Sequence, residues 1–532
     1  MQKYYKKAYN EIVTVLETIL LKVRFGAGKH LGTFFCFLGN CVLGNAEYRR
    51  MIMREEKTAA LAAIESRKDI ICGVADRIWE YAELSLQEVK SAALYCNVLE
   101  KEGFRVEKGI SGIQTAFSAS FGSGRPVIGI LAEYDALSGL SQEAGCTTEK
   151  PLVEGGSGHG CGHNLLGAGA MAAAFGVKAY LEQNQTEGTV ILYGCPGEEG
   201  GAAKAFMARD GVWKDLDAAL TWHPEDVNEV ATGSSNACIQ TQYKFHGIAS
   251  HASGAPEKGR SALDAVELMN TGVQYLREHM SDKARIHYAI TDAGGCSPNV
   301  VQAKASVLYM VRSNHVAEAI ELQERVDRIA QGAALMTDTT FEKKFIDGLS
   351  DTISNFTLEH LLYQNYEELG VPSYTEEENA FADTLSKTYM GNDRIPGVAA
   401  ANDEKAKEQV LAMQKACGHA MNAFLAPLYQ GDAFQAGSTD VGDVSWLTPT
   451  AQIHVAAWPN GCPGHSWQNV SCDRTEIGHK AAIHAGKVLA ATAIDLYNQP
   501  DVLREARAEF EKRTAAGFVS PVPADAVPVI PD

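Results

Sequence analysis

Two short segments carry side chains that bind metal ions and move protons. In the first, Cys161 and His163 are separated by one glycine, which lets the backbone turn tightly enough for both side chains to face one ion. In the second, Glu198 and Glu199 are adjacent in a glycine-rich turn. Successive side chains there point in different directions, so one carboxylate can bind metal while its neighbour acts as a general base. Together, the two segments predict a metal-dependent hydrolase.

Each of these residues also has a structural interpretation, because buried cysteines and histidines are often core groups and paired glutamates are often solvated. Their positions favour the metal site. An apolar, strand-like run precedes Glu198 and Glu199, and a second one, residues 218–222, precedes His223. Catalytic residues of open α/β sheets lie at the carboxyl ends of strands. His223 therefore joins the candidate ligands.

The elements that must position these residues alternate between helical and strand-like patterns. The segment from Asn164 to Ala179 is rich in alanine and glycine, which predicts a tightly packed buried helix directly behind the ligands. Residues 237–350 contain, in order, a strand, a helix, a strand and a helix, predicted at 239–245, 261–279, 305–311 and 316–334. This order fits a small α+β insert in a larger α/β fold.

The composition is that of a large soluble enzyme. A chain of 532 residues with 45% hydrophobic content can bury a substantial core, and its length favours more than one domain. A formal net charge of −19 argues against nucleic acid and anionic membranes as partners. The 12 cysteines lack the regular spacing of a disulfide scaffold, which favours a reducing compartment and a cytoplasmic location.

The first 56 residues are harder to assign. They are basic, and residues 31–46 are apolar enough to resemble the hydrophobic region of a signal peptide. That region begins unusually far from the N-terminus and is too short for a membrane span. Export is the alternative if residues 1–46 act as a signal. A second alternative is an over-extended gene start, because Met51 and Met53 precede the interpretable sequence.

Several further motifs, in order along residues 60–500, resemble a family of metallopeptidases and aminoacylases that includes carboxypeptidase G, hippurate hydrolases and auxin-conjugate hydrolases. Besides the two segments above, the motifs lie at residues 133–137, 247–253, 259–265, 437–440 and 463–465. Glu133 and Asn164 stand where the family commonly has aspartate. These departures leave open how the groups behind the metal ligands are arranged.

The resemblance implies a site with two divalent metal ions, Mn²⁺ or Zn²⁺, and Glu198 as the general base. The implied ligands are Cys161, His163, Glu199, His223 and His465. A thiolate ligand suits zinc, while imidazole and carboxylate ligands also suit manganese.

Asp135 follows the apolar strand at 126–131, where its carboxylate can orient a metal-binding imidazole or cap a helix. The resemblance gives His251 the role of stabilising the carbonyl oxyanion, often across a dimer; without it, His251 is only a polar residue in a turn. Asn299 and Arg312 match residues that hold substrate oxygens or a carboxylate. A surface role is the alternative for Arg312. Two further implied substrate contacts come from the backbone of Gly437 and Ser438.

The implied architecture is a mixed-sheet, zinc-peptidase-like catalytic domain with an inserted ferredoxin-like domain. The predicted divisions are an N-terminal extension (1–56), the two parts of the catalytic domain (57–236 and 351–500), a lid or dimerisation domain (237–350) and a C-terminal tail (501–532), extended from Ala515. A homodimer or a heterodimer with a related subunit is expected.

The implied reaction is hydrolysis of an amide bond between an acyl or aroyl group and an amino acid, with p-aminobenzoyl-glutamate as the preferred substrate. A dipeptidase or N-acyl-amino-acid hydrolase is one alternative, and a metal-binding subunit that acts only with a paralogous partner is another. A thiol hydrolase is a third, although Cys161 and His163 are poorly spaced as nucleophile and base.

Overall fold

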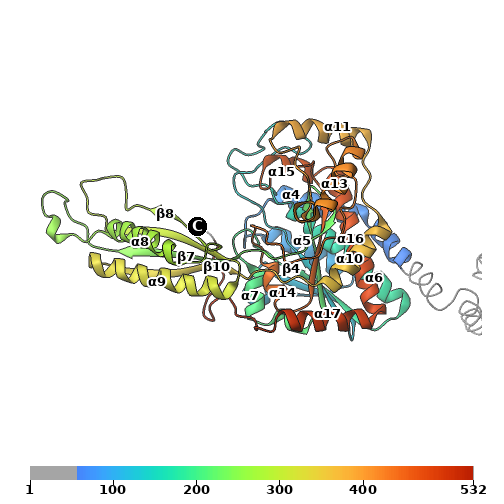
Figure 1. Ribbon diagram of the computed structural model, residues 1–532, viewed down its shortest axis with the longest axis horizontal. Helices are drawn as coiled ribbons and strands as arrows, with labels where there is room; N and C mark the ends of the chain where they lie inside the picture. The colour runs from blue at the N-terminus through green and yellow to red at the C-terminus, as the bar shows by residue number, and fades with distance from the viewer. Residues whose placement is uncertain (1–56, 531–532) are drawn as a thin grey trace, which may run out of the picture. The chain divides into compact units, whose positions relative to one another are not determined.

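The computed structural model describes residues 57–530, which contain two β-sheets covered by helices (Figure 1). The predicted N-terminal extension lies outside the described residues. The larger sheet has seven strands of mixed direction and the smaller has four. The predicted α/β class with a mixed sheet is therefore confirmed. Within residues 57–530, every helix is too short or too polar to cross a lipid bilayer.

The larger sheet has the strand order β1-β2-β4-β3-β5-β11-β6. Its strands are β1 (Arg105–Lys108), β2 (Phe117–Ser123), β3 (Val127–Ala132), β4 (Gly188–Gly194), β5 (Ala218–Glu225), β6 (Glu229–Val230) and β11 (Thr450–Ala456). The central strands β4, β3, β5 and β11 are mutually parallel, and the outer strands pair antiparallel. Parallel strands buried on both faces are apolar throughout, as β3 is. Their carboxyl ends meet at one edge of the sheet.

Helices α6 (His163–Asn184) and α16 (Glu476–Asn498) pack on each other and on one face of this sheet. Small residues let them approach closely. A Cβ added at Gly169 of α6 would lie 2.6 Å from the indole nitrogen of Trp222 on β5, and one added at Gly486 of α16 would lie 2.6 Å from Cβ of Ala172. The predicted alanine- and glycine-rich helix is therefore α6, and His163 is its first residue.

Other helices complete the layers around the larger sheet. Side chains of α7 (Ala203–Arg209) and α14 (Val441–Ser445) pack on the opposite face, around Trp213, Leu131 and Tyr193. The remaining helices of this region are α4 (Lys68–Tyr81), α5 (Val89–Lys101), α7 (Ala203–Arg209), α10 (Phe356–Leu369), α11 (Glu376–Leu385), α12 (Val398–Asn402), α13 (Glu404–Cys417), α14 (Val441–Ser445), α15 (Trp467–Asp473) and α17 (Pro500–Arg513).

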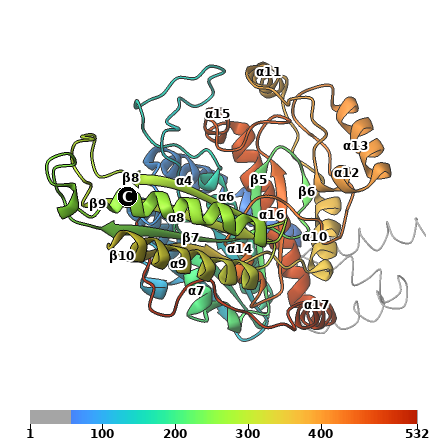
Figure 2. The same ribbon diagram turned by 60° about the vertical axis from the view of Figure 1, so that its left-hand side comes forward.

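The smaller sheet is antiparallel, with the strand order β10-β7-β9-β8. Its elements follow the chain order β7 (Ala237–His246), α8 (Ala262–Leu276), β8 (Arg285–Asp292), β9 (Lys304–Ser313), α9 (Val316–Thr337) and β10 (Thr340–Leu349). The two helices pack together on one face (Figure 2). This is the β-α-β-β-α-β order of a ferredoxin-like layout. A lid or dimerisation role, and the division of the chain into domains, stay predictions.

Three elements depart from the predicted pattern. Strand β8 was not predicted because it is an edge strand, exposed along most of its length, and lacks a clear apolar alternation. The first half of strand β10 contains the charged residues 342–344, which hide its strand character. The first part of the predicted C-terminal tail forms helix α17, whose single fully buried residue is Ala506. Described residues after Gly517 form no helix or strand.

Two linkers connect the sheets, at residues 233–236 and 350–355, and they contact each other. The Ser235 hydroxyl lies 2.7 Å from the Thr352 hydroxyl. Both linkers also contact α14 or the segment that leads into it. The Asn236 N–H donates to the Gly437 carbonyl oxygen before α14 at 2.9 Å, and the Ser350 N–H and hydroxyl both donate to the Asp443 carboxylate within α14. The linkers and this segment therefore form one hydrogen-bonded unit.

The buried carboxyl group of Asp443 is expected to make the stability of this protein depend on pH. Burial raises the pKa of Asp443 to about 7, whereas an unfolded aspartate titrates near ~3.9. The folded chain therefore binds more protons than the unfolded chain between these values, so this group lowers the free energy of unfolding as pH rises, by up to ~1.4 kcal/mol per pH unit. Urea denaturation at several pH values measures this effect. The free energy of unfolding should fall less steeply with rising pH in Asp443→Asn than in the parent protein. Equal slopes in the two proteins would contradict this account.

Candidate active site

Carboxylate and histidine side chains lie at the carboxyl ends of the parallel strands of the larger sheet. Strand β3 leads into Glu133 and Asp135, strand β4 leads into the turn that carries Glu198 and Glu199, and β5 carries His223 near its end. Because β3 lies between β4 and β5 and runs parallel to both, these segments emerge side by side. The grouping of ligand-type residues at strand ends follows from this topology.

The turn before α6 brings Cys161 and His163 to the same place. Gly162 has a φ of 71°, in the left-handed region, and a Cβ there would lie 2.9 Å from Pro224 and 3.0 Å from Trp458. Only glycine fits this turn. As a result, the Cys161 sulfur lies 3.4 Å from Nε2 of His223, and the rings of His163 and His223 have centroids 5.8 Å apart.

Three groups of side chains, which share members, could each hold a metal ion. Within each group the ligand atoms all lie within 4.8 Å of one another. The groups are Cys161, His163 and His223; Cys161, Glu199 and His465; and His163, Glu198 and Glu199. His465 comes from the loop before α15, and its Nε2 lies 3.2 Å from Oε1 of Glu199. The structure thus brings together all five residues predicted as metal ligands, with the predicted base beside them.

The hydrogen bonds at Nδ1 of buried His163 and half-buried His223 leave Nε2 of each ring as the ligand atom for a metal. Nδ1 of His163 donates to the Asp135 carboxylate at 2.8 Å, and Nδ1 of His223 donates to the Pro224 carbonyl oxygen at 2.6 Å. Each bond leaves the lone pair on Nε2. Nε2 of His163 is buried without a hydrogen-bond partner and lies 3.3 Å from a carboxylate oxygen of Glu133. Burial lowers the pKa of His223 to about 4, which keeps that imidazole neutral.

The thiol and the carboxylates have electrostatics suited to a cation. Burial raises the pKa of the Cys161 thiol well above its ordinary value, so the thiolate needs a positive partner. Burial also raises the pKa of Glu198 well above its usual range, and the neighbouring Glu133 and Glu199 carboxylates raise it further. Oε1 of Glu199 is buried, and Nε2 of His465 lies 3.2 Å from it. The residues present therefore fit divalent metal ions.

Asp135 is placed to orient His163. Its buried carboxylate also accepts hydrogen bonds from the Ser85 hydroxyl and from the Glu199 N–H, each at 2.9 Å. Burial would raise its pKa, but the interaction with His163 outweighs burial and holds the pKa of Asp135 at about 2. The carboxylate is therefore ionised at neutral pH and links one predicted ligand to the backbone of another.

A buried lysine beside the site was not recognised from the sequence. Lys204, on α7, is fully buried, and its ammonium lies 2.7 Å from Oε1 of Glu133 and also pairs with Asp440. The Lys204 N–H donates to the same Asp440 carboxylate at 3.0 Å. A lysine flanked by the apolar residues Ala203, Ala205 and Phe206 was the available signal, because lysine is almost never fully buried unless it is paired.

Three predicted residues lie on the smaller sheet's part of the chain, outside the three metal-ligand groups. The Ala252 N–H next to His251 donates to the Asn299 carbonyl oxygen at 3.0 Å, and both loops are exposed. Nδ1 of His251 accepts the Gly254 N–H at 3.1 Å, which places the proton of the neutral ring on Nε2. The Arg312 guanidinium, on β9, lies against the sulfur of Met310.

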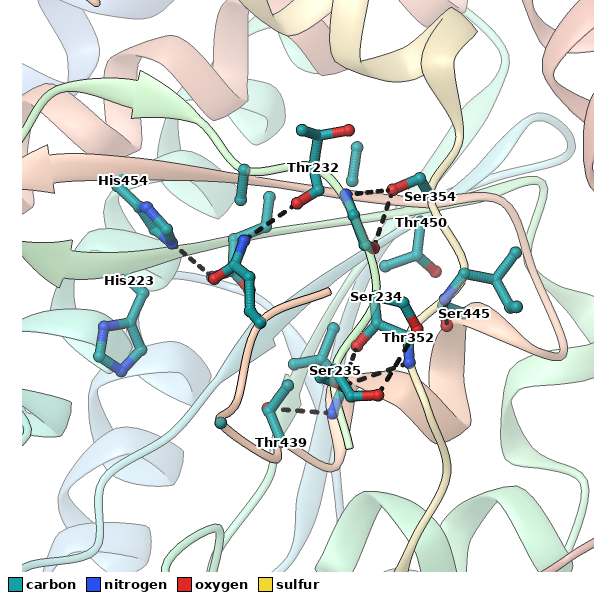
Figure 3. A pocket seen from close by; sticks show the side chains of 18 of the residues that line it. His223, Thr232, Ser234, Ser235, Thr352, Ser354, Thr439, Ser445, Thr450 and His454 are labelled. Carbon is teal, nitrogen blue, oxygen red and sulfur yellow. Dashed lines mark hydrogen bonds between the residues drawn. The ribbon is translucent and has the colours of Figure 1, made fainter. Parts of the chain in front are cut away.

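A cavity of about 250 Å³ adjoins the ligand-type residues and includes His223 in its wall (Figure 3). Gly437 and Ser438, both predicted substrate contacts, also line it. His454 lines the cavity too, and its Nδ1 lies 3.1 Å from the Glu229 carboxylate. The cavity extends along the two linkers, whose hydroxyl groups face it (Figure 3).

Comparison with known proteins identifies the class. The sequence pattern of peptidase family M20/M25/M40 matches residues 129–422. One of the subunits of the p-aminobenzoyl-glutamate hydrolase of Escherichia coli K12 is 45% identical over 477 residues, which cover 88% of this chain and 97% of that protein. The chain belongs to peptidase family M20/M25/M40, and it is a metal-dependent hydrolase of amide bonds.

The chain is also similar to two more distant proteins. The human Xaa-Arg dipeptidase is 25% identical over 86% of this chain and 92% of its own length. The crystal structure of an aminobenzoyl-glutamate utilization protein from Klebsiella pneumoniae covers 81% of this chain and 97% of its own, with a TM-score of 0.53 and 16% identity. At that identity the likeness shows a shared fold.

Proposed function

We propose that this protein hydrolyses p-aminobenzoyl-glutamate to p-aminobenzoate and glutamate. The observation that carries this proposal is the convergence of Cys161, His163, Glu199, His223 and His465 around one point, with Glu198 beside them. The name of the 45% identical relative supports the choice of substrate. An amide between an aroyl group and an amino acid has the planar carbonyl and the leaving nitrogen that such a site can act on.

Two divalent ions, Mn²⁺ or Zn²⁺, are proposed as cofactors. The three ligand groups overlap in Cys161, His163 and Glu199, so the candidate ligands form one continuous cluster that neighbouring ions could occupy. When bound, such ions polarise the scissile carbonyl and lower the pKa of water. Thiolate, imidazole and carboxylate donors suit zinc, and the imidazoles and carboxylates also suit manganese.

Glu198 is proposed as the general base. Its carboxylate takes a proton from the attacking water and then delivers it to the leaving nitrogen, so that the carbonyl carbon gains an oxygen as the carbon–nitrogen bond breaks. A base works best when its pKa is near the working pH, and burial and nearby acids raise the pKa of Glu198 above its usual range. Asp135 holds His163 in the tautomer that presents Nε2 to a metal.

Substrate binding is proposed to need the smaller sheet's loops. His251 presents an Nε2–H that suits a carbonyl oxyanion, and Arg312 and Asn299 suit the glutamate carboxylates. We propose that His251 acts on the active site of a second chain, in a homodimer or a heterodimer with a related protein. Size-exclusion chromatography with an assay of each fraction tests this role, because a fully active monomer would contradict it.

Two other functions have specific support. The Xaa-Arg dipeptidase relatives support a dipeptidase, and the 45% identical relative, named as one subunit of a hydrolase, supports a chain that acts only with a paralogous partner. We also propose a cytoplasmic location: the ten cysteines that the structure describes are all free, as expected in a reducing compartment. Cell fractionation tests this location.

Release of free glutamate from p-aminobenzoyl-glutamate tests the proposed reaction. The purified protein is expected to release glutamate with manganese or zinc present, to lose activity after chelation and to regain it when metal returns. A thiol hydrolase would keep its activity in the chelator. Cleavage of a dipeptide panel without cleavage of p-aminobenzoyl-glutamate would favour the dipeptidase, and activity that appears only with a related subunit would favour the paralogous assembly.

A further inference from the structure

The cavity beside His223 has a chemical character that the metal site alone does not explain. Among the described residues that line it, none is a lysine or an arginine, and two, Glu225 and Glu359, are acidic. Most of the others carry hydroxyl or amide groups. A substrate carboxylate would meet no cation here and would face like charge, which disfavours binding. The cavity is therefore unsuited to the glutamate end of the substrate.

Glu359 offers the cavity a strong hydrogen-bond acceptor. It lies on α10 with 1% of its surface exposed, and its Oε2 accepts the Thr232 hydroxyl at 3.0 Å and the Gln430 amide at 3.4 Å. A carboxylate has about four acceptor sites, so these two bonds leave capacity for a ligand N–H. Glu359 thus provides a buried acceptor in a wall whose other residues are mostly neutral.

Besides Glu359, two neutral side chains of the cavity wall can form hydrogen bonds with a ligand. The Ser438 hydroxyl oxygen is buried and has no hydrogen-bond partner among the described residues. The Gln452 amide lies beside His454, with 3.2 Å between Nε2 of Gln452 and Nε2 of His454, on the strand that borders the cavity. Buried polar groups are normally hydrogen-bonded, so an unpaired hydroxyl at a cavity wall is available to bond a ligand.

The size of the cavity fits one half of the substrate. Pockets that enclose a whole drug-sized ligand measure roughly 300–1,000 Å³, and this cavity, at about 250 Å³, is smaller. His223, a predicted metal ligand, forms part of its wall, so a group in the cavity would be attached to the carbonyl under attack.

We propose that this cavity is the acyl-group pocket and that Glu359 selects acyl groups with a hydrogen-bond donor at the far end, such as the aromatic amine of p-aminobenzoyl. This inference rests on the proposed function, because it assigns one end of the proposed substrate. Glu359 is a specificity-determining residue in this account and takes no part in bond breaking.

Paired substrates test the pocket. The ratio of kcat/KM for p-aminobenzoyl-glutamate to that for benzoyl-glutamate, which lacks only the amine, is expected to exceed about tenfold in the parent protein, because losing the amine leaves a buried acceptor unpaired. Glu359→Gln should lower this ratio toward one. Glu509→Gln is the matched control: Glu509 accepts the Phe356 and Thr357 N–H groups at the start of the same helix, and it does not line the cavity. That variant should keep the parent ratio.

Product binding, measured by calorimetry on the full protein, tests the acyl-group pocket separately from the proposed hydrolysis of p-aminobenzoyl-glutamate. p-Aminobenzoate should bind more tightly than benzoate, and Glu359→Gln should remove most of that difference. An unchanged substrate ratio and an unchanged binding difference in Glu359→Gln would overturn the pocket assignment and leave the proposed reaction standing. If the parent cleaves neither substrate but shows the binding difference and loses it in Glu359→Gln, the pocket assignment stands and the proposed reaction fails.

Discussion

Replacing Glu198 by glutamine is expected to lower kcat for glutamate release by about 10²–10⁴-fold, the usual contribution of a general base. Glutamine has nearly the same shape but cannot accept the proton of the attacking water. The groups that hold the metal ligands, such as Asp135 behind His163, remain in place. Steady-state kinetics with p-aminobenzoyl-glutamate gives the effect, and metal analysis of the same preparation shows that the ions are retained.

Glu199→Gln is the matched comparison, because it changes the adjacent carboxylate. Glu199 belongs to two of the three metal-ligand groups, so its variant should lose bound metal as well as activity. Full activity of Glu198→Gln with metal bound would show that another group is the base. Metal loss in Glu198→Gln equal to that in Glu199→Gln would make Glu198 a ligand instead.

Replacing Lys204 by methionine is expected to cost about 3–5 kcal/mol of unfolding free energy, because removing one partner of a buried ion pair leaves the other charges unpaired. Here the unpaired groups would be Glu133 and Asp440, both buried. Chemical denaturation gives the difference. Activity should fall as well, since Glu133 lies beside His163 and raises the pKa of Glu198.

Two further variants test this account of Lys204. Adding Asp440→Asn to Lys204→Met removes one of the unpaired carboxylates and should recover part of the lost stability. Lys68→Met is the control at the surface, where an exposed pair with Glu476 at 3.3 Å contributes at most ~1 kcal/mol. If Lys204→Met and Lys68→Met lower the free energy of unfolding equally, the buried ion pairs of Lys204 with Glu133 and Asp440 contribute no more than an exposed pair.

The metal-ligand residues were predictable because their signal is local. A glycine between Cys161 and His163, two adjacent glutamates after an apolar run and a histidine that ends another run are all visible in the sequence. Strand ends meet at one edge of a parallel sheet, so these local signals were enough to indicate a common site. The helix behind them, rich in glycine and alanine, was visible for the same reason.

The missed features depend on contacts between distant segments. Lys204 and Asp440 are 236 residues apart, and nothing in either segment indicates that they pair. The cavity wall combines α10, β11, both linkers and the 435–441 segment, so its chemistry appears only after folding. Edge strand β8 and the charged start of β10 have no apolar alternation, because the pairing of their backbones, and not burial, defines them as strands.

The missing side chain at Gly169 sets the distance between two histidines that are far apart in sequence. Gly169 allows the indole of Trp222 to lie against α6, where its N–H donates to the Leu166 carbonyl oxygen at 2.8 Å. His163 begins that helix and His223 directly follows Trp222. The separation of the two imidazoles is thus set by the packing of α6 on β5, so the affinity and choice of metal depend in part on the absence of a single methyl group at Gly169.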